Sequence, residues 1–208
     1  MILANFVVAV FVVLLFVHSA VAQDRMPPIP KERMTEAQKK AADDLVAGPR
    51  GVLAGPFVPL LRSPELMSRM QKTGEYLRFH NSVGQKLTEF VILLTARQWT
   101  QQYEYDVHGP LALKAGVKPE LIRAITEGRR PTGMGADEEA AYDFCTELYQ
   151  NHGVSDATYA RAISMLGEQG VVDMSGLIGY YTTLAMIMNV ARTPIDGGKN
   201  PPLLPFPH

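Results

Sequence analysis

Apolar residues recur along this chain at the three-to-four-residue spacing of amphipathic helices, and no stretch shows sustained two-residue alternation. The pattern therefore predicts an all-α protein, with one helix before residue 50 and about seven helices after it. Thr35, Ser63-Pro64 and Ser155 each stand before a helical stretch and are typical of helix starts. The predicted helices cover residues 36–48, 64–79, 86–100, 103–115, 118–127, 136–152, 155–167 and 171–191.

Two of these helices, 86–100 and 171–191, are apolar nearly all round and are expected to be buried. Two such helices present more apolar surface than the core of one small domain usually buries. We therefore expect a homo-oligomer in which the remaining apolar surface is buried between subunits. Segment 48–61 is rich in Gly and Pro and is predicted to be irregular, with its apolar residues laid across the domain.

The N-terminus begins with an unbroken apolar run from Phe6 to Val17, which is shorter than the ~20 residues of a membrane span. Ala20-Val21-Ala22 follows it, as in the small-residue cleavage site of a secretory signal peptide. We therefore expect a periplasmic or secreted protein, cleaved near Ala22/Gln23. No Lys or Arg precedes the apolar run, so an uncleaved membrane anchor stays open as the alternative.

This reading divides the chain into four segments. Residues 1–22 are the expected signal peptide, and residues 23–49 form an N-terminal extension with one helix. Residues 50–195 form the helical domain, and residues 196–208 form a Pro/Gly-rich tail.

The formal net charge is -1, and residues 1–22 contain no Asp, Glu, Lys or Arg, so the mature chain has the same charge. A near-neutral chain of this kind is not expected to bind nucleic acid. Cys145 is the single cysteine, which excludes an intramolecular disulfide and a CxxC redox centre. It lies in an apolar-periodic stretch and is predicted to be a small buried hydrophobe.

The candidate chemistry centres on Glu104 and His108, which share one helix face because they are four residues apart. Such a pair can be a proton relay, two metal ligands or a solvated ion pair. A metal site would need further ligands, and no second HxxxH or ExxH lies nearby to supply them. Thr100 is predicted to cap this helix, and Pro110 predicts a kink or break after His108.

The chain resembles the carboxymuconolactone decarboxylase family, whose relatives include the AhpD-type alkylhydroperoxidases. The resemblance rests on LTEFVILLTARQWTQQYEYDVHGPLALKAGVKPELIRAI (87–125) and GYYTTLAMIMNVARTPI (179–195), and it spans roughly residues 50 to 195. It implies an AhpD-like all-helical domain with a helical hairpin around the site, assembled as a trimer or hexamer.

The redox branch of this family has a Glu, then a CxxC, then a His four residues beyond the second Cys. On this chain the Glu falls on Glu89 and the His on His108, while Gln101 and Glu104 occupy the two cysteine positions. A peroxidase or peroxiredoxin-type label could follow from the family. Because the thiols are missing, we do not expect peroxide reduction.

The resemblance implies a cofactor-independent and metal-independent lyase that acts on a small carboxylated lactone or a related acid. His108 would donate the proton, and Glu104 would orient the imidazole and hold its charged form. Glu89 would be a second acid or relay, unless it is simply the partner of Arg97. In one straight helix Glu89 would lie ~22 Å from Glu104, so a turn between two helices is required.

Three further residues are candidates for substrate binding. Arg97 could pair with the substrate carboxylate or with Glu89, while Gln101 and Tyr103 are candidate pocket-lining groups. The alternative from a different class is a non-catalytic oligomeric protein that binds a small ligand in the same pocket.

Overall fold

The computed structural model of the protein describes residues 24–195, 197 and 202–204, and the expected signal peptide and most of the tail lie outside them. Within these residues the fold is all-α, without a strand, as the sequence predicts. The elements are a 3₁₀ turn η1 (Lys31–Arg33), α1 (Glu36–Ala47), α2 (Phe57–Leu60), α3 (Pro64–Phe79), α4 (Gln85–Gln98), α5 (Gln102–Lys114), α6 (Pro119–Thr126), α7 (Ala136–Asn151) and α8 (Asp156–Ala191).

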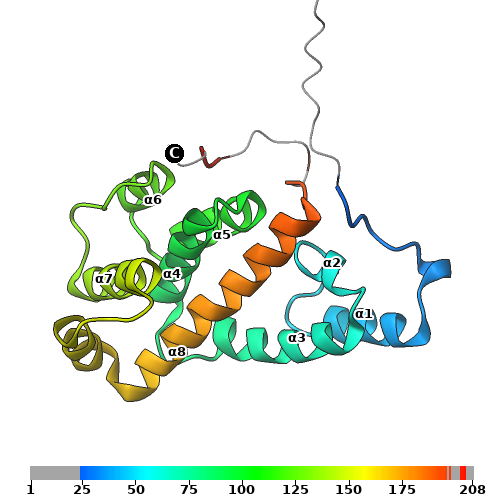
Figure 1. Cartoon of the computed structure of the whole chain (residues 1–208), viewed down its shortest axis with the longest axis horizontal. Coiled ribbons are helices and arrows are strands. Elements are labelled where there is room, and N and C mark those ends of the chain that lie inside the picture. The colour runs from blue at the N-terminus through cyan, green and yellow to red at the C-terminus, as the bar shows by residue number, and fades with distance from the viewer. Residues whose placement is uncertain (1–23, 196, 198–201, 205–208) are drawn as a thin grey trace, which may run out of the picture.

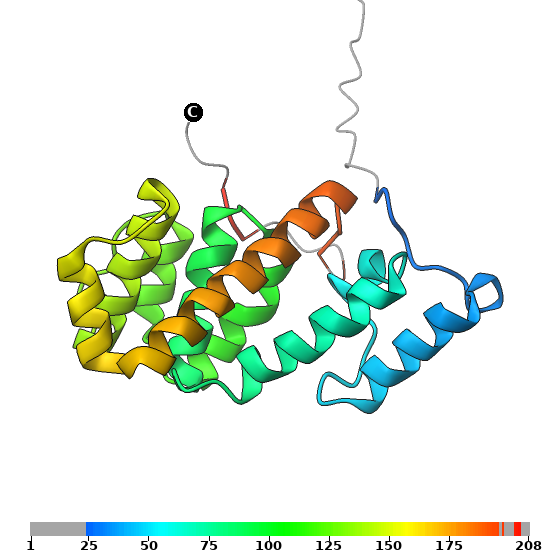
Figure 2. The same cartoon turned by 60° about the horizontal axis from the view of Figure 1, so that its bottom comes forward.

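The helices form two groups that α8 joins (Figures 1 and 2). Helices α1, α2 and α3 lie on one side of the molecule, while α4 to α7 lie on the other. Helix α8 packs against α4 and α7 in one group and against α2 and α3 in the other. The junction between the groups is therefore lined by the segment before α2, the end of α3, α5 and α8, and this arrangement positions the site described below.

Helix α4 is the centre of the core. Most of its side chains are buried, including Phe90, Val91, Ile92 and Leu93, which have no exposed surface. The prediction that this nearly all-apolar helix is buried is confirmed, because α5, α6, α7 and α8 all pack around it. Glu89 is buried in the same helix.

Capping explains most helix starts. The Thr35 hydroxyl accepts a hydrogen bond from Gln38 N, and the Gln38 side chain accepts one from Thr35 N, which completes a capping box at α1. The Ser155 hydroxyl caps α8 in a similar way by accepting from Thr158 N. Both caps agree with the predicted boundaries.

Two local expectations were wrong. The Gln101 side chain caps α5 by accepting from Tyr103 N and Glu104 N, whereas Thr100 has a φ of 46° and forms the turn before it. Helix α5 also continues through Pro110, so the predicted break after His108 is absent, although Pro lacks the N–H of a helical residue. The alternative of a kink at this position stays a prediction. In addition, the irregular segment 48–61 contains the short helix α2.

Helix α8 is interrupted at Gly167, whose φ of 70° and ψ of 177° are not helical. This break matches the predicted end of one helix at Gly167 and the start of another at 171. By length and composition α8 could also cross a membrane, but 56% of its most apolar window is buried inside the structure. It therefore serves here as the core helix that joins the two groups.

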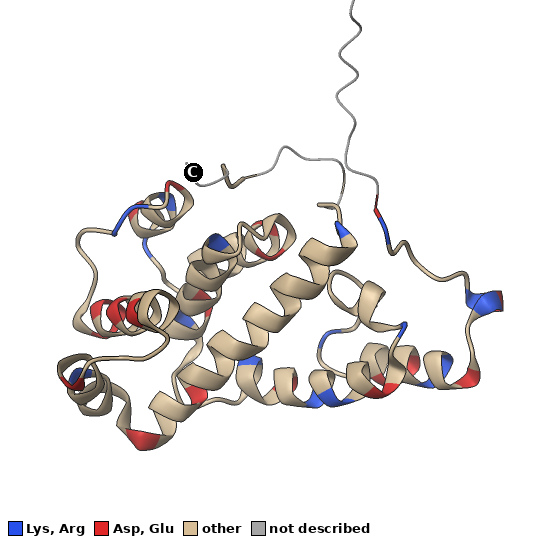
Figure 3. Cartoon of the chain, viewed as in Figure 1, with Lys and Arg blue, Asp and Glu red and all other residues tan. Residues whose placement is uncertain are grey.

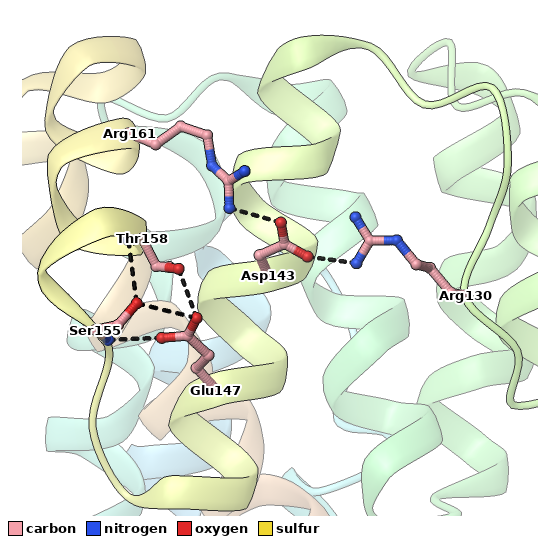
Figure 4. A network of polar contacts seen from close by, with 6 residues as sticks. All are labelled: Arg130, Asp143, Glu147, Ser155, Thr158 and Arg161. Carbon is pink, nitrogen blue, oxygen red and sulfur yellow. Dashed lines mark hydrogen bonds and ion pairs between the residues drawn. The ribbon is translucent and has the colours of Figure 1, made fainter.

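Polar contacts fix the start of α8 against α7 (Figure 4). Glu147 accepts hydrogen bonds from Ser155 N at 2.6 Å and from the Thr158 hydroxyl at 2.6 Å. These donors hold the pKa of the Glu147 carboxyl below its usual value. Asp143 pairs with Arg161 at 2.6 Å and also with Arg130. In the cartoon of Figure 3, positions of charged residues are frequent along the other helices, while the second half of α8 carries few of them.

Candidate active site

A turn between α4 and α5 brings Glu89 to His108, as the straight-helix distance requires. Thr100 adopts the left-handed conformation, and Gln101 N then donates to the carbonyl of Ala96, which closes the turn. The two helices pack side by side, so residues 19 positions apart in sequence come into contact. The sequence requirement for a turn is met.

His108 lies between two carboxylates. Its Nδ1 is 2.6 Å from Glu89 Oε2, and its Nε2 is 3.3 Å from Glu104 Oε2. All three side chains are at least 95% buried, so Glu104 and His108 are not an exposed ion pair. The Gln85 amide donates to Glu89 Oε1 at 2.9 Å and fixes the carboxylate plane behind the ring.

The carboxylates decide the charge of the imidazole. Burial alone would lower the pKa of His108, because it penalises the charged ring. The hydrogen bonds to Glu104 and Glu89 outweigh that effect, and the pKa of His108 is raised above its ordinary value. This environment therefore favours the imidazolium, which can donate from both nitrogens at once.

The His108 ring lies in the wall of a pocket of about 300 Å³ at the junction of the two helix groups. This volume is at the low end of the range for small-molecule sites. The walls come from the segment before α2, the end of α3, the start of α5 and the middle of α8. The lining residues are Pro49, Arg50, Val52, Ala54, Pro56, Phe57, Arg78, Phe79, Tyr103, Glu104, Val107, His108, Tyr181 and Leu184.

The two nitrogens of His108 face different environments. Glu104, the partner of Nε2, lines this pocket together with His108. Glu89, the partner of Nδ1, instead lines a neighbouring pocket with Gln85. The Nε2 edge of the ring is therefore on the side of the pocket that Arg50 and Arg78 also line. The contact of Nε2 with Glu104 is also longer than that of Nδ1 with Glu89. A proton on Nε2 is the one available to a bound molecule.

Tyr181 also lines this pocket, although the sequence analysis does not single it out. Its ring meets the His108 ring edge to face, with the centroids 5.3 Å apart. Its hydroxyl is buried without a hydrogen-bond partner in the structure. Burial raises the pKa of Tyr181 well above its usual value, so the hydroxyl is a neutral donor in the pocket.

Not all the predicted binding residues reach this pocket. Tyr103 lines it, but Gln101 is occupied as the cap of α5 and donates to the Asn189 side chain at 2.9 Å. Arg97 donates to the carbonyl of Leu204 at 2.6 Å and lines a separate pocket. Eight residues along α4 advance the helix by ~12 Å and turn it by roughly 80°, which explains why Arg97 does not accompany Glu89.

Two other arginines occupy the pocket that holds His108. Arg50 comes from the Gly/Pro-rich segment and Arg78 from the last turn of α3. Neither residue is near Glu104 or His108 in sequence, so spacing gave no signal for them. The only sequence hint was the apolar character of segment 48–61, which suggested that it covers part of the domain.

The residues that thiol or metal chemistry would need lie outside the His108 pocket or are not grouped as metal ligands in the described part of the chain. Cys145 is 1% exposed on α7, lines the separate pocket with Arg97, and burial raises the pKa of its thiol. The predicted buried, unpaired state of Cys145 is confirmed. In the described part of the chain, no group of three or more His, Cys, Asp or Glu side chains is arranged to hold a metal ion.

Comparison with known proteins gives a fold but no family. No protein-family model and no curated protein matches the chain. The chain is similar to the crystal structure of the apo form of the debrominase Bmp8, with a TM-score of 0.63 and 11% sequence identity. The match covers 83% of this chain and 92% of that chain. At this identity the two chains share an all-helical fold, and the family resemblance of residues 50–195 stays a prediction.

Proposed function

We propose that the protein is a cofactor-independent acid–base enzyme that protonates a small carboxylated substrate, as in 4-carboxymuconolactone decarboxylase. One observation carries the proposal: the His108 imidazole is buried between Glu89 and Glu104 in the wall of a pocket of about 300 Å³. Raised pKa values and burial are typical of proton donors at functional sites. The fold shared with an enzyme makes an enzyme plausible.

The reaction that suits this site is decarboxylation of an unsaturated acid. The bond between the carboxylate carbon and the ring breaks, carbon dioxide leaves, and the electron pair shifts through the neighbouring double bond. The far carbon then takes the proton from His108 Nε2. His108 recovers a proton from solvent before the next turnover, while Glu89 keeps the ring oriented through Nδ1.

Glu104 has two roles in this proposal. Its carboxylate stabilises the His108 imidazolium before the proton is transferred. Because Glu104 also lines the pocket, it can pass the proton from His108 Nε2 to a substrate that does not reach Nε2 itself. The Tyr181 hydroxyl would donate to an oxygen of the lactone, because it has no partner in the protein.

Peroxide reduction by a thiol is not part of the proposal, because Cys145 lies on α7 beside a different pocket. The remaining alternative is the non-catalytic binding protein, which would use the same pocket without proton transfer.

The test is turnover of 4-carboxymuconolactone by residues 23–208, followed by ultraviolet absorbance, for the wild type and His108→Gln. We expect the variant to lose at least ~100-fold in kcat, the usual contribution of a positioned acid. His80→Gln is the control, because His80 is exposed at the end of α3 and outside the pocket. Equal activity in His108→Gln would remove His108 as the donor, and a wild type that binds the lactone without converting it would favour the binding protein.

A further inference from the structure

Arg50 and Arg78 line the same pocket as His108 but have no acidic partner among the described residues. The Nε atom of each guanidinium is buried and has no hydrogen-bond partner. Buried polar atoms are nearly always satisfied in folded proteins. Two unsatisfied cationic donors in one pocket wall therefore indicate a ligand that supplies the acceptors.

Aromatic rings, rather than carboxylates, hold the two guanidinium groups. Arg50 lies 4.8 Å from the centroid of the Phe57 ring and 6.0 Å from that of Phe79, and Arg78 lies 5.1 Å from the Phe79 ring. Stacking on an aromatic face positions a guanidinium and leaves its N–H groups free to donate. Both arginines are thus prepared for a planar acceptor such as a carboxylate.

A glycine makes room for this arrangement. A Cβ added at Gly74 would lie 2.0 Å from the Tyr180 hydroxyl and 2.8 Å from Arg50 Nη2. Only glycine therefore lets Tyr180 and Arg50 come this close to α3, where Arg50 donates to the Tyr180 hydroxyl at 3.4 Å. The position of Arg50 depends on three elements and is built into the fold.

We propose that Arg50 and Arg78 form a subsite that binds a carboxylate of the substrate in the pocket that His108 and Glu104 also line. The charges at the pocket favour an anion, since two arginines and the His108 imidazolium outweigh the two carboxylates of Glu104 and Glu89. The ligand body is largely apolar, because the remaining lining residues, among them Phe57, Phe79 and Leu184, are aliphatic or aromatic.

The assignment of a substrate class to this subsite rests on the proposed function and extends it. A carboxylate held by two guanidinium groups is stabilised as an anion, so it is a poor group to lose as neutral carbon dioxide. If the reaction is a decarboxylation, the carboxylate in this subsite is the one that the product retains. The substrate class is then a small unsaturated dicarboxylate, with the carbon that takes the proton near His108 Nε2.

The experiment measures binding without any turnover. Isothermal titration calorimetry of the chain with benzoate and with its neutral isostere benzamide compares wild type, Arg50→Gln and Arg78→Gln. We expect the wild type to prefer benzoate, and each variant to bind benzoate roughly ten- to a hundredfold more weakly, as expected for a lost charged hydrogen bond. Benzamide affinity should change by less than about threefold, within the spread of such effects.

Three controls separate the subsite from general damage. Arg69→Gln removes an exposed arginine of α3 outside the pocket and should leave benzoate binding unchanged. Arg50→Lys and Arg78→Lys keep the charge but lose the planar fork, so benzoate binding should fall less than in the Gln variants. They also cover the case in which a Gln variant misfolds. Far-ultraviolet circular dichroism checks the helical content of each variant.

Unchanged benzoate affinity in both Gln variants overturns the subsite, and so does a wild type without preference for benzoate. Parallel losses for benzoate and benzamide also overturn it, because they indicate a collapsed pocket. Failure of the proposed function gives a different result. If the preference for benzoate depends on the arginines but the protein does not convert the lactone, the subsite stands and the proposed function is overturned. If His108→Gln loses turnover but benzoate binding does not depend on the two arginines, the proposed function stands and the subsite is overturned.

Discussion

His108 is the residue on which the site depends, and its environment explains both its charge and its position. A buried cation is stable only when it is paired and hydrogen-bonded. Glu89 and Glu104 supply two carboxylates to one imidazolium, which leaves an excess of negative charge. The guanidinium groups of Arg50 and Arg78 line the same pocket and offset it. The arginines therefore serve the charge balance of the site, in addition to the binding of substrate that we propose for them.

The raised pKa of His108 predicts how stability depends on pH. The folded pKa lies above the unfolded value of 6.5, so the stabilisation from the paired imidazolium is fully present below pH 6.5. It is lost as the pH rises through the folded pKa. We expect the free energy of unfolding in urea to fall over this range, and the His108 ring proton resonances to titrate with a midpoint above 6.5.

Two variants check the cause of this pH dependence. Glu104→Gln removes a hydrogen bond that raises the pKa, so the His108 midpoint should move down. In His108→Gln the loss of stability above pH 6.5 should become smaller than in the wild type. A His108 midpoint at or below 6.5 in the wild-type protein would contradict the prediction.

At the scale of the elements, the helices could be predicted because their signals are local. Thr35 and Ser155 cap helices through contacts within three residues, and Gly167 breaks α8 through its own backbone conformation. Gln101 replaced Thr100 as the α5 cap because Thr100 was needed in the left-handed turn that folds α5 back on α4. That requirement comes from tertiary packing and has no signal at Thr100 itself.

The site residues also divide into those that sequence signals identify and those that only tertiary packing brings into the pocket. Glu104 and His108 could be paired from sequence because they share a helix face, whereas Glu89 was placed beside them by the family resemblance and requires a turn between two helices. Arg50 and Arg78 could not be found because their place in the pocket follows from the packing of α3 and α8 across the two helix groups. Arg97 was favoured because it shares a helix with Glu89, but helix geometry points it elsewhere.

The close approach of α3 to α8 gives an element-scale prediction. Gly74→Ala should lower the free energy of unfolding by about 1–3 kcal/mol, because the new methyl group overlaps the Tyr180 ring and hydroxyl. Thr73→Ala is the matched control: it also improves helix propensity in α3, but Thr73 is exposed. It should change stability by less than about 0.7 kcal/mol, in the stabilising direction.

Urea unfolding followed by circular dichroism measures both variants. If Gly74→Ala is as stable as Thr73→Ala, the contact between α3 and Tyr180 is looser than the structure describes. The same variant should weaken benzoate binding, since the Cβ also overlaps Arg50 Nη2. That second readout connects the packing of the helix groups to the subsite.

At the scale of the whole molecule, the outer face of α8 supports the predicted homo-oligomer. Between residues 172 and 190 the one charged residue is Asp173, and it is buried, where it accepts hydrogen bonds from Tyr76 and Ser82. The exposed positions of this stretch are uncharged, with Val172 69% and Val190 60% exposed. Figure 3 shows the same half of α8 without charged positions along its outer side. An uncharged apolar face of this length is typical of a protein–protein interface.

We therefore predict that residues 23–208 form a trimer or hexamer in which this face of α8 is buried. Val172→Glu and Val190→Glu together should shift the assembly to monomers, because each places a charge in an apolar contact and must be desolvated. Val46→Glu is the control, since Val46 is exposed on α1, away from α8. Size-exclusion chromatography with light scattering gives the mass of each form. A monomeric wild type would contradict the prediction, and an assembly that survives both substitutions would place the interface on another face.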